Sequence, residues 1–177
     1  IGLFESVEFE QRDLSKIIDK LKKLKPDVIY FAGLYEDAGS FLQKCKEHDI
    51  ESIFMFGDGI ATSEMIQASG GPDMLNGIFM SFFDFPANSQ AKKVIKSFAE
   101  QRITPEGYTL NAYAAVQAIV QAIEKTASTD TVKMAKWLHS NKVETVIGDL
   151  QWDEKGDLVK APFIIYKWND DGEYKPY

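Results

Sequence analysis

Three short apolar runs recur at a fixed spacing, and this repeat limits the chain to few folds. The runs are VIYFAG, IFMFGDG and IFMSFF, which begin at Val28, Ile53 and Ile78, 25 residues apart. Continuously apolar runs rich in β-branched and aromatic residues are typical of strands covered on both faces. The intervals between them carry helical patterns, which gives the order β-α-β-α-β. This order predicts an α/β fold with a parallel sheet flanked by helices.

Capping and terminating residues place the helices around these strands. The stretch before the first run predicts a helix over 14–24, ended by Pro26. A second helix is expected from Glu36 to about Ile50, with acidic residues at its positive end. Thr62 or Ser63 would cap a short third helix that stops at Gly70–Gly71. The opening segment IGLFESVEF is itself strand-like.

The pattern changes after Phe83, and we interpret residues 83–88 as a crossover between two lobes. DFPANSQ is rich in turn residues. It is followed by a predicted helix from Ser89, a long Ala-rich helix ending near Thr126, and a third helix capped by Thr129 or Asp130. The last forty residues predict hairpins with turns at Lys155–Gly156 and Asp171–Gly172.

Composition excludes several classes of partner. The formal net charge is −7 with a pI near 4.9, so no nucleic-acid or anionic-membrane surface is expected. The lysine-rich stretch Lys16–Lys25 is interpreted as the solvent face of an amphipathic helix. No apolar run approaches the roughly 20 residues that span a bilayer. The chain opens on Ile1 instead of Met, as expected of a processed chain or a fragment.

Neither a metal site nor a cofactor is predicted. Cys45 is the single cysteine, which rules out an internal disulfide. Cys45 and His48 are three residues apart on a predicted helix, but two more zinc ligands cannot be placed, so a buried cysteine beside a surface histidine is the better interpretation. The acidic stretches DEKGD and NDDGE lack the ligand spacing of a calcium loop and are expected to be hairpin turns.

The residues that follow the strands are the candidates for function. Ligands of open parallel sheets bind outside the carboxyl ends of the strands. Asp58 lies there between Gly57 and Gly59, at the point where a buried strand gives way to a helix. It could pair with a ligand ammonium while the glycines allow close backbone approach. A simple turn or cap aspartate explains the spacing equally well.

Several longer motifs resemble one family. LNAYAAVQAIVQAIEKT (110–126) and TVIGDLQWDEKGDL (145–158) are similar to the C-terminal half of type I periplasmic binding proteins, as are KPDVIYFAGLYEDAGSFLQKCKEHDI and the FMFGDG loop. The nearest group is the leucine/isoleucine/valine-binding proteins of branched-chain amino acid ABC importers. The resemblance extends over nearly all 177 residues.

This resemblance implies two α/β lobes that close on a small ligand. Residues 1–82 and 162–177 would form an incomplete second lobe, and residues 88–160 the later part of the first lobe. Residues 83–87 and 158–162 would be the hinge crossovers. The N-terminal portion of the fold, including the first strand and helix of the second lobe, would be absent.

The resemblance also implies the binding residues. Asp58 matches the acidic residue that pairs with the ligand's α-ammonium, where the nearest relatives carry Glu. Leu34 falls on the position of an aromatic contact residue, with Tyr35 next to it. Gly33 and Gly57 fit the close approach at the same loops, and Tyr108 could face the cleft.

The function implied is a non-enzymatic, extracytoplasmic solute receptor that delivers an amino acid to a membrane permease. It would lie in the periplasm, or outside a Gram-positive cell on a membrane anchor. A domain-swapped or fragment dimer is a further expectation, because strand faces would be left uncovered. The alternatives are a signalling receptor domain that uses the same cleft, a hydrolase or transferase on a doubly wound sheet, and a receiver with Asp58 as phosphoacceptor.

Overall fold

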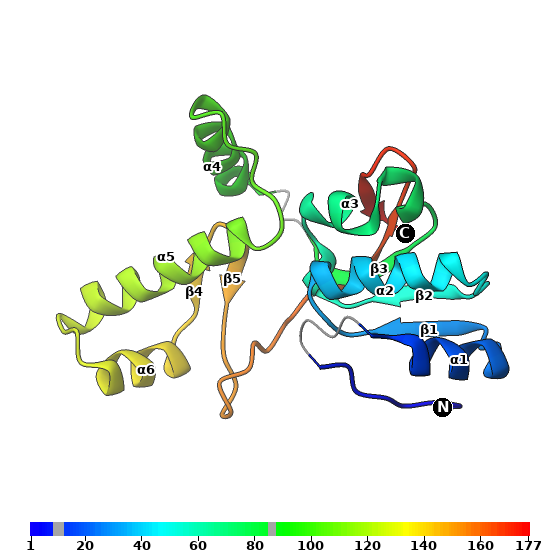
Figure 1. The fold of residues 1–177 in the computed structure, drawn as a ribbon. Helices are drawn as coiled ribbons and strands as arrows, with labels where there is room; N and C mark the ends of the chain where they lie inside the picture. Colours follow the sequence, from blue (N-terminus) through cyan, green and yellow to red (C-terminus); the bar gives the residue numbers. More distant parts are fainter. Residues whose placement is uncertain (9–12, 85–87) are drawn as a thin grey trace. The chain divides into compact units, whose positions relative to one another are not determined.

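The computed structural model describes residues 1–8, 13–84 and 88–177 and divides into two compact units. Unit 1 contains Ile1–Phe82 and Phe163–Tyr177, and unit 2 contains Phe83–Pro162. The elements of unit 1 are α1 (Ser15–Leu24), β1 (Val28–Phe31), α2 (Tyr35–Glu47), β2 (Ile53–Phe56), the 3₁₀ turn η1 (Asp58–Ile60), α3 (Glu64–Ser69), η2 (Pro72–Leu75), β3 (Phe79–Phe83), β6 (Phe163–Trp168) and β7 (Tyr174–Pro176) (Figure 1).

The five strands of unit 1 form one sheet in the order β1-β2-β3-β6-β7. The strands β1, β2 and β3 are parallel, with Val28 opposite Ile53 and Met55 opposite Phe79. The chain therefore has the parallel α/β core that the 25-residue repeat predicts. The strands β6 and β7 form an antiparallel hairpin, which confirms the predicted turn at Asp171–Gly172.

The covering of this sheet differs from the prediction. Along β1, Ile29 and Phe31 are buried, whereas Val28 is 52% and Tyr30 60% exposed. The same alternation continues in β2, where Ile53 is 54% exposed. The expectation that these strands are covered on both faces is wrong for β1 and β2. Their apolar runs supply both faces with hydrophobic residues, but only one face is buried in the described part of the chain.

Helix α2 packs on the buried face of the sheet. The Phe31 ring stacks on Phe41 of α2, with centroids 4.8 Å apart. A side chain at Gly39 would place its Cβ 2.4 Å from the backbone carbonyl carbon of Ala68 in α3. The absence of a side chain at Gly39 therefore sets how closely α2 and α3 approach.

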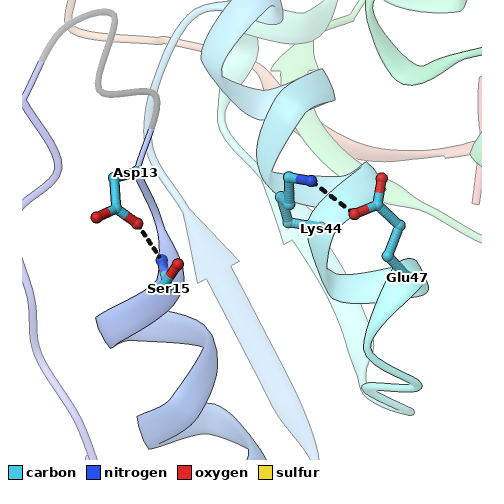
Figure 2. Close-up of polar contacts among 4 residues, drawn as sticks. All are labelled: Asp13, Ser15, Lys44 and Glu47. Atoms are coloured by element: carbon cyan, nitrogen blue, oxygen red, sulfur yellow. Dashed lines mark hydrogen bonds and ion pairs between the residues drawn. The ribbon is translucent and has the colours of Figure 1, made fainter.

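Two surface contacts lie at the ends of α1 and α2 (Figure 2). The Asp13 carboxylate accepts a hydrogen bond from the backbone N–H of Ser15 at 3.0 Å, at the first turn of α1. The Lys44 ammonium pairs with Glu47 at 2.6 Å on the last turn of α2. Helix α1 lies where the sequence predicts a helix, and its Ile18 and Leu21 are buried.

The strand expected at the start of the chain does not form within residues 1–8, which carry no helix or strand. The last residue of that prediction lies outside the described residues. The segment instead follows α1: Glu5 pairs with Lys20, and a Cβ atom built on Gly2 would lie 3.3 Å from the Leu24 side chain. Strand-like residues become a strand only beside a partner strand.

Unit 2 contains three helices and a small hairpin within its described residues. They are α4 (Ser89–Glu100), α5 (Thr109–Thr126), α6 (Thr131–Ser140), β4 (Val143–Thr145) and β5 (Gly148–Leu150). Its core cluster joins Ala91, Leu110 and Ala114 to Val146. The Gln117 amide oxygen accepts from the Val146 N–H at 2.7 Å, which ties α5 to the β4–β5 turn.

The predicted caps and turns of unit 2 are partly confirmed. Asp130 caps α6 by accepting from the Lys133 N–H at 2.9 Å. The turn at Lys155–Gly156 is closed by Asp153, whose carboxylate accepts from two backbone N–H groups. The turn joins an antiparallel bridge between Trp152 and Leu158, beside which the Val159 N–H donates to the Gln151 carbonyl at 2.9 Å, and this confirms the predicted hairpin.

We expect Gly39→Ala to destabilise the protein although alanine is the better helix former. The helical preference favours alanine by about 1 kcal/mol. The clash with the Ala68 backbone should outweigh this gain and lower the free energy of unfolding by about 1–3 kcal/mol in total. Urea unfolding followed by circular dichroism measures the change. Ser40→Ala, on the next residue of α2, is the matched control and should have a much smaller effect.

Candidate functional site

The candidate site is formed by the two loops that follow β1 and β2. Parallel strands end at the same edge of a sheet, so these loops are neighbours although 25 residues separate them in sequence. Gly57 extends the pairing by one residue, since its N–H donates to the Phe31 carbonyl at 3.3 Å. Asp58 follows directly as the first residue of η1. The structure thus places Asp58 next to the loop that carries Gly33 and Leu34.

A direct backbone contact joins the two loops. A Cβ atom built on Gly59 would lie 2.4 Å from the carbonyl oxygen of Gly33 and 3.4 Å from the Cα atom of Leu34. No other residue fits at position 59 without displacing one of the loops. The sequence explains Gly59 as allowing close backbone approach, and the structure shows that the approaching group is the neighbouring loop.

The glycine on the other side of Asp58 has a different role. Gly57 has φ −75° and ψ −173°, an extended conformation open to any residue. A Cβ atom there would meet only the Tyr30 hydroxyl, at an ordinary 3.4 Å. Tyr30 therefore lies beside the candidate site, and the sequence interpretation did not include it. Tyr30 alternates along β1 with the buried Ile29 and Phe31, so its side chain faces the other side of the strand. This alternation is the signal that could have identified it.

Leu34 and Tyr35 begin α2 at this rim. Leu34 occupies the N-cap position, and its side chain is 51% exposed. Tyr35 is half-buried as the first residue of the helix. Both side chains are available next to the Asp58 loop, although neither forms a side-chain cap.

The electrostatic environment of the rim is negative. A hydrogen bond to Glu36 raises the pKa of Tyr35, and burial and the charges of Glu36 and Glu64 raise it further. The sequence contains no Lys or Arg between Glu47 and Ala91, the stretch that includes β2 and the Asp58 loop. A carboxylate in such surroundings favours a cationic ligand group over an anionic one.

Unit 2 holds a separate hollow of about 740 Å³. It is lined by Phe98 of α4 and by residues of α5 that include Thr109, Tyr113 and Val120. None of the described residues that line it carries a charge. This hollow lacks a counter-charge for an ammonium group, and it contains none of the predicted site residues. Tyr108 also belongs to unit 2, where its ring lies 6.5 Å from that of Phe83.

The remaining sequence candidates have structural roles. Cys45 is fully buried in α2, and His48 is the C-cap residue of that helix. Among the described residues, no group of three His, Cys, Asp or Glu side chains could hold a metal ion. In the NDDGE stretch, the Asn169 side chain accepts from the N–H groups of Asp171 and Glu173, as expected of a hairpin turn.

These features define an α/β unit whose candidate site lies at the ends of its parallel strands. A family model described as "Periplasmic binding protein" matches residues 4–173. The chain therefore belongs to the periplasmic binding protein family, whose members bind solutes. No helix in the described residues is long and apolar enough to cross a membrane.

Individual relatives agree with this assignment. The chain is 34% identical over 173 residues to an amino acid binding protein of Pseudomonas aeruginosa, covering 97% of this chain and 46% of the relative. It is 35% identical over 176 residues to Leu/Ile/Val-binding protein homolog 1 of Brucella abortus, covering 97% of this chain and 47% of that relative. The chain thus spans about half the length of the curated relatives it matches.

Solved structures share the fold. A leucine-binding protein from Thermotoga maritima superposes with a TM-score of 0.85 at 22% identity, covering 97% of this chain and 49% of that one. A branched-chain amino acid binding protein from Streptococcus pneumoniae, solved with isoleucine, gives a TM-score of 0.77 at 19% identity. The match covers 94% of this chain and 48% of that one. Both confirm the predicted type I periplasmic binding protein fold.

We expect Gly59→Ala and Gly57→Ala to differ strongly although both glycines flank Asp58. The methyl group added by Gly59→Ala would collide with the Gly33 carbonyl and should lower the free energy of unfolding by about 1–3 kcal/mol. The methyl group added by Gly57→Ala meets only the end of a side chain and should change stability little. Urea unfolding of both variants measures the difference; equal losses would contradict the inter-loop contact.

Cys45 should be unreactive in the folded protein. Burial raises the pKa of its thiol to about 12, so almost no thiolate exists at neutral pH. A thiol reagent that absorbs on reaction should label Cys45 only in denaturant. Labelling of the native protein at the rate of an unfolded control would show that α2 opens readily.

Proposed function

We propose that the chain is part of an extracytoplasmic solute-binding protein that captures an amino acid, of the branched-chain type, for import by an ABC transporter. The observation that carries the proposal is the half-buried Asp58 carboxylate, held at the strand-end rim by the contact between Gly59 and Gly33. Relatives named as Leu/Ile/Val-binding and amino acid binding proteins support the ligand class. The site of action is the periplasm, or the outer surface of a Gram-positive cell.

Asp58 binds the α-ammonium group of the ligand in this proposal. The carboxylate provides the counter-charge, and a partly dry environment strengthens the pairing relative to water. The surrounding rim adds further negative charge. Residues 47–91, which include the Asp58 loop, contain no Lys or Arg. An ammonium is therefore attracted there, while the ligand's own carboxylate must be bound by other groups.

Leu34 and Tyr35 contact the side chain of the ligand. They lie at the start of α2, beside the loop of Asp58, and Leu34 offers an exposed aliphatic surface. Burial of an aliphatic ligand side chain against such a surface contributes roughly 25 cal/mol per Å² of apolar area. An apolar contact and a single counter-charge together select a neutral aliphatic amino acid.

Closure of two lobes on the ligand, and transfer of the ligand to a membrane permease, complete the proposal. Gly33 and Gly57 serve as the close-approach positions of the site. No covalent chemistry is required, because the ligand is released unchanged. Closure would be driven only by the ligand's higher affinity for the closed state.

Asp58→Asn tests the proposal with little change in shape. In the longest form of the protein that carries this chain, we expect the affinity for leucine, isoleucine and valine to fall by about 2–5 kcal/mol, because the ammonium loses its counter-charge. Isothermal titration calorimetry measures the affinity. Asp73→Asn, which removes the same charge from an exposed turn of unit 1, should leave affinity unchanged. Unchanged affinity of Asp58→Asn would remove Asp58 from the site.

A further inference from the structure

We propose that Asn76 is a site of deamidation, and that the reaction depends on opening of the turn over residues 75–78 away from β6. The sequence contains a single Asn-Gly pair, Asn76-Gly77. The Asn76 side chain is exposed, whereas Leu75 and Ile78 on either side of the pair are buried. The proposal concerns covalent modification of the chain and is independent of the proposed ligand.

Deamidation joins the Asn76 side chain to the backbone nitrogen of the next residue. The Gly77 nitrogen gives up its proton and bonds to the amide carbon of Asn76, and the side-chain nitrogen takes up a proton and leaves as ammonia. Water then adds to either carbonyl of the cyclic imide and opens the ring, which gives aspartate or isoaspartate. Glycine favours the attack because no side chain crowds its nitrogen. The other asparagines of the chain precede residues with side chains, namely Ser89, Ala112, Lys142 and Asp170.

The native turn holds the reacting atoms of this pair apart. Asn76 has φ −56° and ψ 121°, and Gly77 has φ 84°, as in a type II turn. The Ile78 N–H closes the turn by donating to the Leu75 carbonyl at 3.0 Å. Ring closure requires the Gly77 nitrogen to eclipse the Asn76 Cβ atom, which an L-residue reaches at a ψ of about −120°. The nitrogen therefore lies about a third of a turn away from its reactive position.

Hydrogen bonds to β6 keep the turn in this conformation. The Gly77 N–H, which is the attacking group, donates to the Trp168 carbonyl at 3.1 Å. The Trp168 N–H in turn donates to the Ile78 carbonyl at 2.9 Å. Rotation about ψ of Asn76 turns the Gly77 N–H away from β6 and breaks the first of these bonds. The reaction thus requires local opening, and its rate in the folded protein is the intrinsic rate multiplied by the open fraction.

The two products should differ in their effect on the turn. Aspartate keeps the backbone unchanged and adds a charge at an exposed position, so the turn can close again. Isoaspartate carries the main chain through its Cβ atom, which lengthens the backbone and displaces the Gly77 N–H from the Trp168 carbonyl. Formation of isoaspartate therefore makes the opening of this turn irreversible.

Peptide mapping by mass spectrometry tests the site in the longest form of the protein that carries this chain. In denaturant we expect Asn76 to deamidate before the other asparagines of the chain. In the folded protein its rate should be at least roughly tenfold lower, because the open fraction is small. Asn76→Gln lengthens the side chain and should abolish modification at this position. Faster reaction of another asparagine in denaturant, or equal rates for folded and denatured protein, would overturn the proposal.

Leu75→Ala tests the dependence on opening of the turn. Loss of this buried side chain loosens the turn and should raise the rate in the folded protein by roughly tenfold. Leu110→Ala removes the same buried side chain from unit 2 and should leave the rate at Asn76 unchanged. Ile78→Val is a milder change at the turn that should raise the rate less.

Circular dichroism verifies that each of these variants is folded, and Ile78→Val carries the test where Leu75→Ala does not fold. A rate that neither turn variant raises would show that opening of the turn does not control the reaction. Asn76→Asp should unfold at the same temperature as the parent protein, whereas purified isoaspartate protein should unfold at a lower one. Equal unfolding temperatures would overturn the irreversible effect of isoaspartate.

Discussion

The contact between Gly59 and the Gly33 carbonyl is the constraint on which the candidate site depends. It fixes how closely the loop after β2 can approach the loop after β1, and so where Asp58 lies relative to Leu34 and Tyr35. A side chain at Gly59 would separate the loops, whereas a Cβ atom at Gly33 would lie 2.6 Å from the Phe31 ring of its own strand. The same ring stacks on Phe41, so the site rests directly on the core beneath it.

The alternating burial of β1 and β2 links the fold to its surface. The residues that face α2 supply the core, while Val28, Tyr30 and Ile53 form an apolar surface on the opposite face. Parallel sheets are normally covered on both faces. Tyr30 lies on this second face, and its hydroxyl lies close to Gly57 at the candidate site. The candidate site is therefore in contact with the exposed face of β1 as well as with the core.

The repeat of apolar runs was sufficient to predict the parallel sheet, and polar residues at element ends were sufficient to predict caps such as Asp130. These features depend on local sequence, where propensity and capping act. Contacts between distant segments could not be predicted in the same way. The Gln117–Val146 hydrogen bond and the approach of Gly59 to Gly33 depend on tertiary packing. An apolar run indicates that a strand face can be covered and does not show what covers it. The predicted lobe boundaries and ligand contacts stay predictions.

Charge follows the direction of β1, with basic residues before the strand and acidic residues after it. Lysines gather before the strand, on α1, and carboxylates gather after it, around Tyr35 and Asp58. Because parallel strands end at one edge, the carboxylates of successive loops add their fields at the same rim instead of spreading over the surface. A cationic group that approaches unit 1 is thus drawn to the strand ends, where Asp58 is only half-buried.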